Sequence, residues 1–227
     1  MNWLMKALST SVGKKFVMAI TGLLLTGFLV THLAGNLLMF AGADEYNAYA
    51  EKLHSMSPML EVAETALFLM FFVHILLALK LTQENRKARK TNYNRKESKK
   101  EDESVSFRPL GIDFSDLMLH TGGILLLFLV LHIIDMKLKA RPDIVYPETS
   151  YDIAITVLSD PISRVVYTLG SLVLVVHLGH GISSAFQSLG LSHSKYTPYI
   201  KCLGMLLAFL IAIGFALLPI IKGGGGP

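Results

Sequence analysis

The chain has 227 residues, of which 52% are hydrophobic and 17% are charged, and its formal net charge is +4. A soluble domain carries about 25% charged residues, so this composition indicates a membrane protein. The basic residues are concentrated in one loop rather than spread over a face, which argues against a nucleic-acid partner. The single cysteine, Cys202, excludes an internal disulfide and a cysteine-rich zinc or iron–sulfur site.

Five apolar segments separated by polar loops predict one all-α transmembrane domain that covers residues 1–227. Each segment reaches the roughly 20 residues that a helix needs to cross a bilayer. The helices are expected at residues 16–41, 58–82, 114–137, 161–189 and 198–221. The first segment is too long for the h-region of a signal peptide, so we interpret it as a retained helix. Backbone groups in lipid must hydrogen-bond internally, which favours an integral membrane bundle of five helices.

Capping residues mark the expected starts of four of these helices. Ser57, Asp160 and Thr197 each precede a proline that would occupy the first helical position. Asp113, with Asp116 three residues later, resembles a capping arrangement for the third helix.

The distribution of basic residues predicts the orientation. Most of the 21 Lys and Arg residues lie at the N-terminus, between Lys80 and Arg108, or in the 190–201 loop. The positive-inside rule therefore places the N-terminus and the basic loop 83–108 in the cytoplasm, as expected for a multi-pass protein of the cell inner (cytoplasmic) membrane. The loop is either a mobile segment or a solvated helical extension. Two functions stay open for it, a topogenic role and the docking of a soluble partner.

Five of the eight histidines lie well inside the predicted spans. Any one of them has an ordinary explanation as an interhelical hydrogen-bonding residue. They recur in four helices, however, at positions 32, 74, 132, 177 and 180. A proton relay would interleave Asp and Glu with these histidines, whereas the acidic residues here lie mostly at or beyond the helix ends. Neutral imidazoles bound to haem iron suit an apolar setting, so we interpret the histidines as haem ligands.

Depth in the membrane predicts how these ligands pair. His32 lies about 25 Å along its helix from Lys15, at ~1.5 Å per residue, and His132 is close to the outer end of its own helix. Both belong to the outer half, whereas His74 and His180 lie at mid-depth or in the inner half. The prediction is an outer haem between His32 and His132 and an inner haem between His74 and His180. Two histidines per iron leave no open position, which favours electron transfer over oxygen chemistry.

The fourth span offers two histidines one turn apart. We prefer His180 as the ligand because Gly179 and Gly181 flank it and leave room for a flat macrocycle. His177 would then bond a propionate, a water or a neighbouring helix. Arg164 lies at the outer rim, where it would either hold a haem propionate or anchor the helix to lipid headgroups.

These features resemble the single-subunit, five-helix, di-haem cytochrome b membrane anchor of succinate:menaquinone oxidoreductase and fumarate reductase. The resemblance covers nearly all of residues 15–221, but its motifs are sparse. They are His32-Leu33, Asn36, Gly42 to Asn47, His54, Pro58, Glu64, His74, His132 and His180-Gly181. It implies two haem b groups and menaquinone as substrate. It also implies a flavoprotein subunit and an iron–sulfur subunit on the cytoplasmic face, with the dicarboxylate chemistry of the tricarboxylic acid cycle on the flavoprotein.

The resemblance further implies a quinone site near the outer haem. The matching positions are Glu51 and His54, with Asp44 and Glu61 as alternative acids. Quinone reduction consumes protons, so a titratable group must lie within reach, although Glu51 is equally explained as a solvated loop carboxylate. One branch of the family uses a glutamate two residues before the last haem ligand for proton transfer. Leu178 stands there in this chain, so that pathway is not supported.

Two other functions compete with this interpretation. One is a haem b anchor of another respiratory dehydrogenase or a hydrogenase. The other, from a different class, is a polytopic transporter that uses intramembrane histidines for metal or proton passage. An absorption spectrum separates haem binding from transport, and redox changes that depend on succinate or fumarate separate the two anchors.

Overall fold

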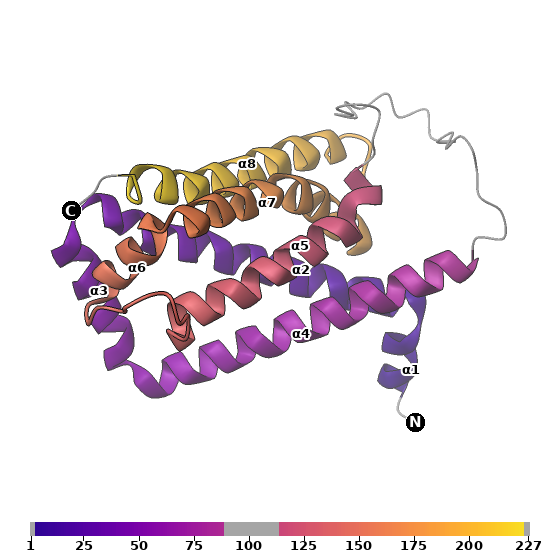
Figure 1. Cartoon of the computed structure of the whole chain (residues 1–227). Helices are drawn as coiled ribbons and strands as arrows, with labels where there is room; N and C mark the ends of the chain where they lie inside the picture. The colour runs from indigo at the N-terminus through magenta and orange to yellow at the C-terminus, as the bar shows by residue number, and fades with distance from the viewer. Residues whose placement is uncertain (1–2, 89–113, 225–227) are drawn as a thin grey trace.

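Five long helices form the body of the protein. A computed structural model describes residues 3–88 and 114–224, and this part of the chain contains helices and no strand. The long helices are α2 (Ser11–Leu37), α4 (Ser57–Ala88), α5 (Phe114–Ile133), α7 (Pro161–Ser188) and α8 (Thr197–Ile221). All five are long and apolar enough to span a membrane, which confirms the predicted all-α bundle (Figure 1).

Short helices join the long ones, and the sequence analysis did not predict them. They are α1 (Trp3–Ser9), the 3-10 helix η1 (Leu38–Phe40), α3 (Ala43–Ser55), the π-helix η3 (Ile134–Leu138) and α6 (Ser150–Ser159). Helix α3 connects α2 to α4 and α6 connects α5 to α7. The two pack against each other at one end of the bundle (Figure 1). With 13 and 10 residues they are too short to register as spans.

The arrangement of the long helices leaves α4 at the edge. Helices α7 and α8 pack along each other, α2 and α5 lie against α7, and α4 packs mainly against α2 (Figure 1). Small residues allow the close approach of α7 and α8, since a Cβ atom on Gly204 would lie 3.0 Å from Ile182 Cγ2. No residue in the most apolar stretch of α4, which the structure describes completely, is buried within the chain. This helix therefore presents its apolar surface outward.

The predicted helix starts are confirmed at one position and wrong at two. Asp160 caps α7, since its Oδ2 accepts the Ser163 N–H at 2.8 Å and Pro161 follows it. Ser57 instead lies inside α4, where its hydroxyl donates to Glu61 at 3.1 Å. Thr197 likewise lies inside α8, and its hydroxyl accepts the His193 N–H at 3.0 Å. In both cases the helix begins one residue earlier than the proline signal indicates.

Two further predictions fall at the margin of the described chain. The Asp113–Asp116 cap lies outside the residues whose side chains the structure describes. Of the basic loop 83–108, residues through Ala88 continue α4 as a helical extension, and the remainder lies outside the described residues.

Candidate functional site

Burial separates the eight histidines into two groups. The five that sequence analysis placed inside the spans are half-buried: His32, His74, His132, His177 and His180. His54, His120 and His193 are exposed. The half-buried residues come from α2, α4, α5 and α7, as the spans predict.

His32 and His132 face each other and form what we call the first histidine site. Their ring centroids are 5.8 Å apart and their planes are nearly perpendicular, at 82°. The Nδ1 atom of His132 is buried and has no hydrogen-bond partner. A buried polar nitrogen without a partner is costly, so His132 has a ligand-binding or hydrogen-bonding position that no group of the described chain satisfies. The two residues predicted to bind one haem are therefore close together.

Aromatic rings enclose this site. Phe28 stacks on His32 at 5.2 Å and Phe128 stacks on His132 at 6.0 Å, each from one turn earlier in the same helix. The Tyr167 ring of α7 lies 5.9 Å from His132, and Phe215 of α8 lies 5.6 Å from His32. The sequence analysis did not identify these four residues, because aromatic side chains are common throughout apolar helices. Together they pack against the two imidazoles and limit the orientations that the rings can adopt.

His74 and His177 occupy two environments that match each other, which we call the second histidine site. Nδ1 of His74 lies 3.1 Å from the Thr21 hydroxyl, and Nδ1 of His177 lies 3.1 Å from the Thr121 hydroxyl. A glycine follows each threonine. A Cβ atom at residue 22 would lie 3.3 Å from Cε1 of His74, and one at residue 122 would lie 3.4 Å from Cε1 of His177. Both rings thus lie directly against a helix backbone.

His180 lies one turn after His177 and interacts with it electrostatically, as His74 also does. The flanking glycine that sequence analysis assigned to haem packing has another neighbour, because a Cβ atom on Gly179 would lie 2.8 Å from Met205 Cε of α8. On the other side, a Cβ atom on Gly181 would lie 4.0 Å from the nearest side-chain atom. The pairing of His74 with His180 stays a prediction.

A buried acidic residue lies beside the first histidine site. Asp135, in the π-helix η3, is completely buried, and its Oδ2 accepts the Tyr167 hydroxyl proton at 3.1 Å. Its Oδ1 has no hydrogen-bond partner and lies 3.7 Å from Arg141 Nη1. Arg141 also pairs with Asp160 and Asp143, each at 3.0 Å. The sequence signal for this network is Asp135, an acidic residue three residues after His132 in an apolar run. It was not predicted as a site residue.

At the exposed end of this network, Arg141 and Asp160 each stabilise the charged form of the other. Burial opposes the charge on Arg141, but hydrogen bonds to Asp143 and Asp160 raise the pKa of its guanidinium above the usual value. The Ser163 backbone N–H holds the pKa of Asp160 below its ordinary value, against the effect of burial, and the Ser163 hydroxyl and Arg141 add to this. Both groups are therefore charged at neutral pH.

The two residues predicted to serve a quinone lie together on α3. Glu51 and His54 are both exposed, and they line a hollow of 230 Å³. Its other walls are Asn47, Glu148, Thr149 and Ser150. The Nδ1 atom of His54 donates to the Ala50 carbonyl at 2.8 Å, since a carbonyl can only accept. Of the alternative acids, Glu61 accepts from Ser57, and Asp44 lies in the first turn of α3.

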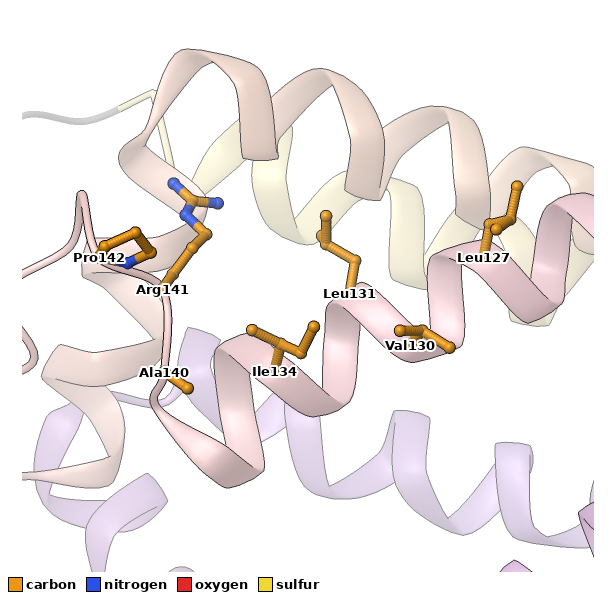
Figure 2. A pocket seen from close by; sticks show the side chains of 7 residues that line it. All are labelled: Leu127, Val130, Leu131, Ile134, Ala140, Arg141 and Pro142. Carbon is orange, nitrogen blue, oxygen red and sulfur yellow. The ribbon is translucent and has the colours of Figure 1, made fainter.

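An apolar groove of 470 Å³ runs along α5 toward Arg141 (Figure 2). Its lining residues are Leu127, Val130, Leu131, Ile134, Ala140, Arg141 and Pro142. In Figure 2 the Arg141 side chain points away from Ala140 toward the neighbouring helices. This direction agrees with its ion pair to Asp160 at the start of α7.

Arg164, expected to contact a haem propionate or lipid headgroups, forms hydrogen bonds to two backbone carbonyls of its own chain. Its Nη2 donates to the Ser159 carbonyl at 3.3 Å and to the Gly223 carbonyl. These two hydrogen bonds connect the end of α6 to the segment after α8. Its Nε atom is buried without an acceptor. Neither expected role is tested by these contacts.

The fold and the site together define a multi-pass helical membrane protein with half-buried histidines in four of its spans. No protein-family model, curated protein or solved structure matches the chain.

Proposed function

We propose that this protein is the di-haem cytochrome b anchor of a succinate:menaquinone oxidoreductase or fumarate reductase, and carries electrons between an iron–sulfur subunit and menaquinone. The observation that carries the proposal is the pair of facing imidazoles, His32 and His132, with an unsatisfied buried nitrogen, inside a bundle of five spans. Haem held by two histidines supplies one-electron transfer without an open iron position.

The surroundings of the first histidine site fit this task. Phe28 and Phe128 stack on the two imidazoles and hold their ring planes. Tyr167 of α7 and Phe215 of α8 add apolar ring surface next to His132 and His32. A site that is dry and rigid lowers the structural rearrangement that accompanies a change of charge at the centre. The enclosure therefore favours electron transfer at this position.

The hollow beside α3 is the proposed site of menaquinone reduction. Glu51 and His54 supply titratable groups from one wall, and Glu148 faces them from the other. Such groups deliver the protons that quinone reduction consumes. The hollow lies at the end of the bundle where α2 ends, the same end as His32.

The distribution of charge supports the proposed orientation, and the family resemblance implies the partners. The basic N-terminus and the 83–108 loop place the cytoplasmic face at the opposite end of the bundle from α3 and α6. The flavoprotein and iron–sulfur subunits dock on that face, and the protein resides in the cell inner membrane. Succinate or fumarate chemistry takes place on the flavoprotein, so this chain acts as the quinone-reactive subunit.

Haem content of the full-length protein tests the proposal. Protein purified in detergent from membranes is expected to show low-spin b-type spectra with two haems per chain. His32→Ala should remove one haem and leave the other, because the second histidine site does not use His32. His193→Ala, at an exposed loop position, is the matched control and should retain both.

Three results would contradict the proposal. Haem-free wild-type protein would refute haem binding and favour the transporter. A His32→Ala variant that loses both haems, or neither, would refute the pairing. Haems in membranes that respond to another respiratory donor, and not to succinate or fumarate, would identify the anchor of a different dehydrogenase or of a hydrogenase.

A further inference from the structure

Helices α2 and α5, each of which contributes residues to both histidine sites, share a sequence repeat. Residues 21–32 read TGLLLTGFLVTH and residues 121–132 read TGGILLLFLVLH. The shared positions are the initial Thr-Gly, one Leu, the Phe-Leu-Val run and the final His. At its shared positions the repeat thus contains the four kinds of residue that α2 and α5 contribute to the two histidine sites: the threonine, the glycine, the stacking phenylalanine and the histidine.

A weaker repeat relates the partner helices α4 and α7. Residues 65–74 read TALFLMFFVH and residues 168–177 read TLGSLVLVVH. Both begin with Thr and end with Val-His, so the repeat aligns His74 with His177 and leaves His180 without a counterpart. Each half of the chain also places one short helix, α3 or α6, between its two long ones. The four long helices that carry the histidines thus fall into two pairs with similar sequence, α2 with α5 and α4 with α7.

The threonine contacts determine which nitrogen of His74 carries the proton. The Thr21 hydroxyl lies 3.0 Å from the carbonyl oxygens of both Val17 and Met18, which can only accept. Its single proton is directed to those carbonyls. With the proton directed to those carbonyls, the hydroxyl oxygen accepts the remaining contact, at 3.1 Å, from His74 Nδ1 as the donor.

His177 has the same arrangement of contacts. The Thr121 hydroxyl donates to the carbonyls of Leu117 and Met118, at 2.9 and 3.2 Å, and accepts from His177 Nδ1 at 3.1 Å. A neutral imidazole with a proton on Nδ1 carries its lone pair on Nε2. Both imidazoles are therefore prepared, in the same tautomer, to bind a metal through Nε2. Hydrogen bonds of this kind orient metal-binding histidines and raise their basicity.

We infer that Thr21 and Thr121 are positioning residues that fix His74 and His177 as a matched pair of Nε2 ligands, and that His177, not His180, binds the second haem. The inference rests on the proposed function for the identity of that haem. It replaces the sequence-based preference for His180, which relied on Gly179 and Gly181 as space for the macrocycle. Met205 lies against Gly179, so only the space beside Gly181 is open.

Haem stoichiometry tests the assignment of the ligand. In the full-length protein purified in detergent, His177→Ala should lower the haem content from two to one per chain, while His180→Ala should retain both. The haem of the first histidine site serves as an internal control for folding, because its spectrum should be unchanged in each variant. Retention of both haems by His177→Ala, with loss of one by His180→Ala, would overturn the inference and leave the proposed function intact.

Isosteric variants test the role of the threonines. Thr21→Val and Thr121→Val remove the hydrogen-bond acceptor but keep the shape, and each should weaken binding of one haem by about 10- to 100-fold. A less basic imidazole stabilises ferric iron less, so the midpoint potential of that haem should rise. The expected rise is about 59 mV for each tenfold by which the affinity for ferric haem falls more than the affinity for ferrous haem. Thr21→Ser and Thr121→Ser retain the hydroxyl and should show the haem affinity and the midpoint potential of the wild type.

Thr26→Val is the matched control. The Thr26 hydroxyl donates to the Gly22 carbonyl at 2.8 Å within α2, in the same way as Thr21 but without a histidine. This variant should leave both potentials unchanged. If Thr21→Val and Thr121→Val behave like Thr26→Val, the positioning role is refuted. Haem-free wild-type protein would instead refute the proposed function itself.

Discussion

Replacement of Tyr167 by phenylalanine tests the buried network beside the first histidine site. The Tyr167 side chain is 6% exposed, and its hydroxyl donates the hydrogen bond that Asp135 receives at Oδ2. Phenylalanine keeps the ring contacts with His132, at 5.9 Å, and with Phe128, at 5.3 Å. The substitution therefore removes one hydrogen bond and little packing.

The magnitude follows from what remains around the carboxylate. Asp135 is completely buried and its Oδ1 already lacks a hydrogen bond, so loss of the tyrosine hydroxyl leaves both oxygens unsatisfied. Arg141, at 3.7 Å, is then the remaining charged neighbour that contacts the group. Leaving a buried acceptor without its donor costs about 1–3 kcal/mol, and more for a charged group. For a chain of this size each kcal/mol lowers the melting temperature by about 2–4 °C.

Thermal unfolding in detergent, at constant detergent and protein concentration, measures this effect. Tyr199→Phe, at a side chain that is 68% exposed, is the control and should match the wild type. The double variant Asp135→Leu/Tyr167→Phe removes both partners and should be more stable than the sum of the single losses predicts. Equal melting temperatures for Tyr167→Phe and Tyr199→Phe would refute the reasoning.

Two further predictions concern packing and pH. A Cβ atom on Gly170 would lie 2.6 Å from Phe128 Cδ2, so Gly170→Ala should cost about 1–3 kcal/mol in the same unfolding assay; Gly27→Ala, where no atom lies within 4 Å, should cost nothing. Asp160→Ala removes the cap of α7 and an acceptor of Arg141, with an expected loss of about 0.5–2 kcal/mol at pH 7. Because the folded-state pKa of Asp160 is lowered, its contribution is complete above the unfolded pKa of about 3.9 and disappears as pH falls through the folded value. Unfolding curves at pH 7 and at progressively lower pH should therefore converge only below about pH 4, and a difference that is independent of pH would contradict this assignment.

The five spans could be predicted from the sequence because lipid imposes simple local requirements. A helix must be about 20 residues long and apolar over that length, and a buried histidine in such a run is conspicuous. Local signals were weaker outside the membrane. The amphipathic helices α3 and α6 are too short to stand out, and the cap at Thr197 was wrong because a proline near a helix start does not distinguish the first helical position from the second.

The contacts between histidines and other side chains depend on the tertiary structure. Position along a helix limits which residues can meet, and the two residues that depth predicted to share one haem, His32 and His132, have ring centroids 5.8 Å apart. The choice between His177 and His180 was beyond such arguments, because one helical turn changes depth very little. It depends on which side of α7 faces Thr121 and which faces Met205, and these neighbours are set by helix packing.

The sequence by itself determined the class of this protein, a five-span bundle with histidines inside it, because hydropathy and length act locally. Only the tertiary structure decided which polar side chains have which neighbours: the aromatic rings around His32 and His132, the burial of Asp135 beside Tyr167, and the threonine partners of His74 and His177. The reason is physical. A polar group inside a membrane must find a partner, and helices distant in sequence supply that partner only once they are packed.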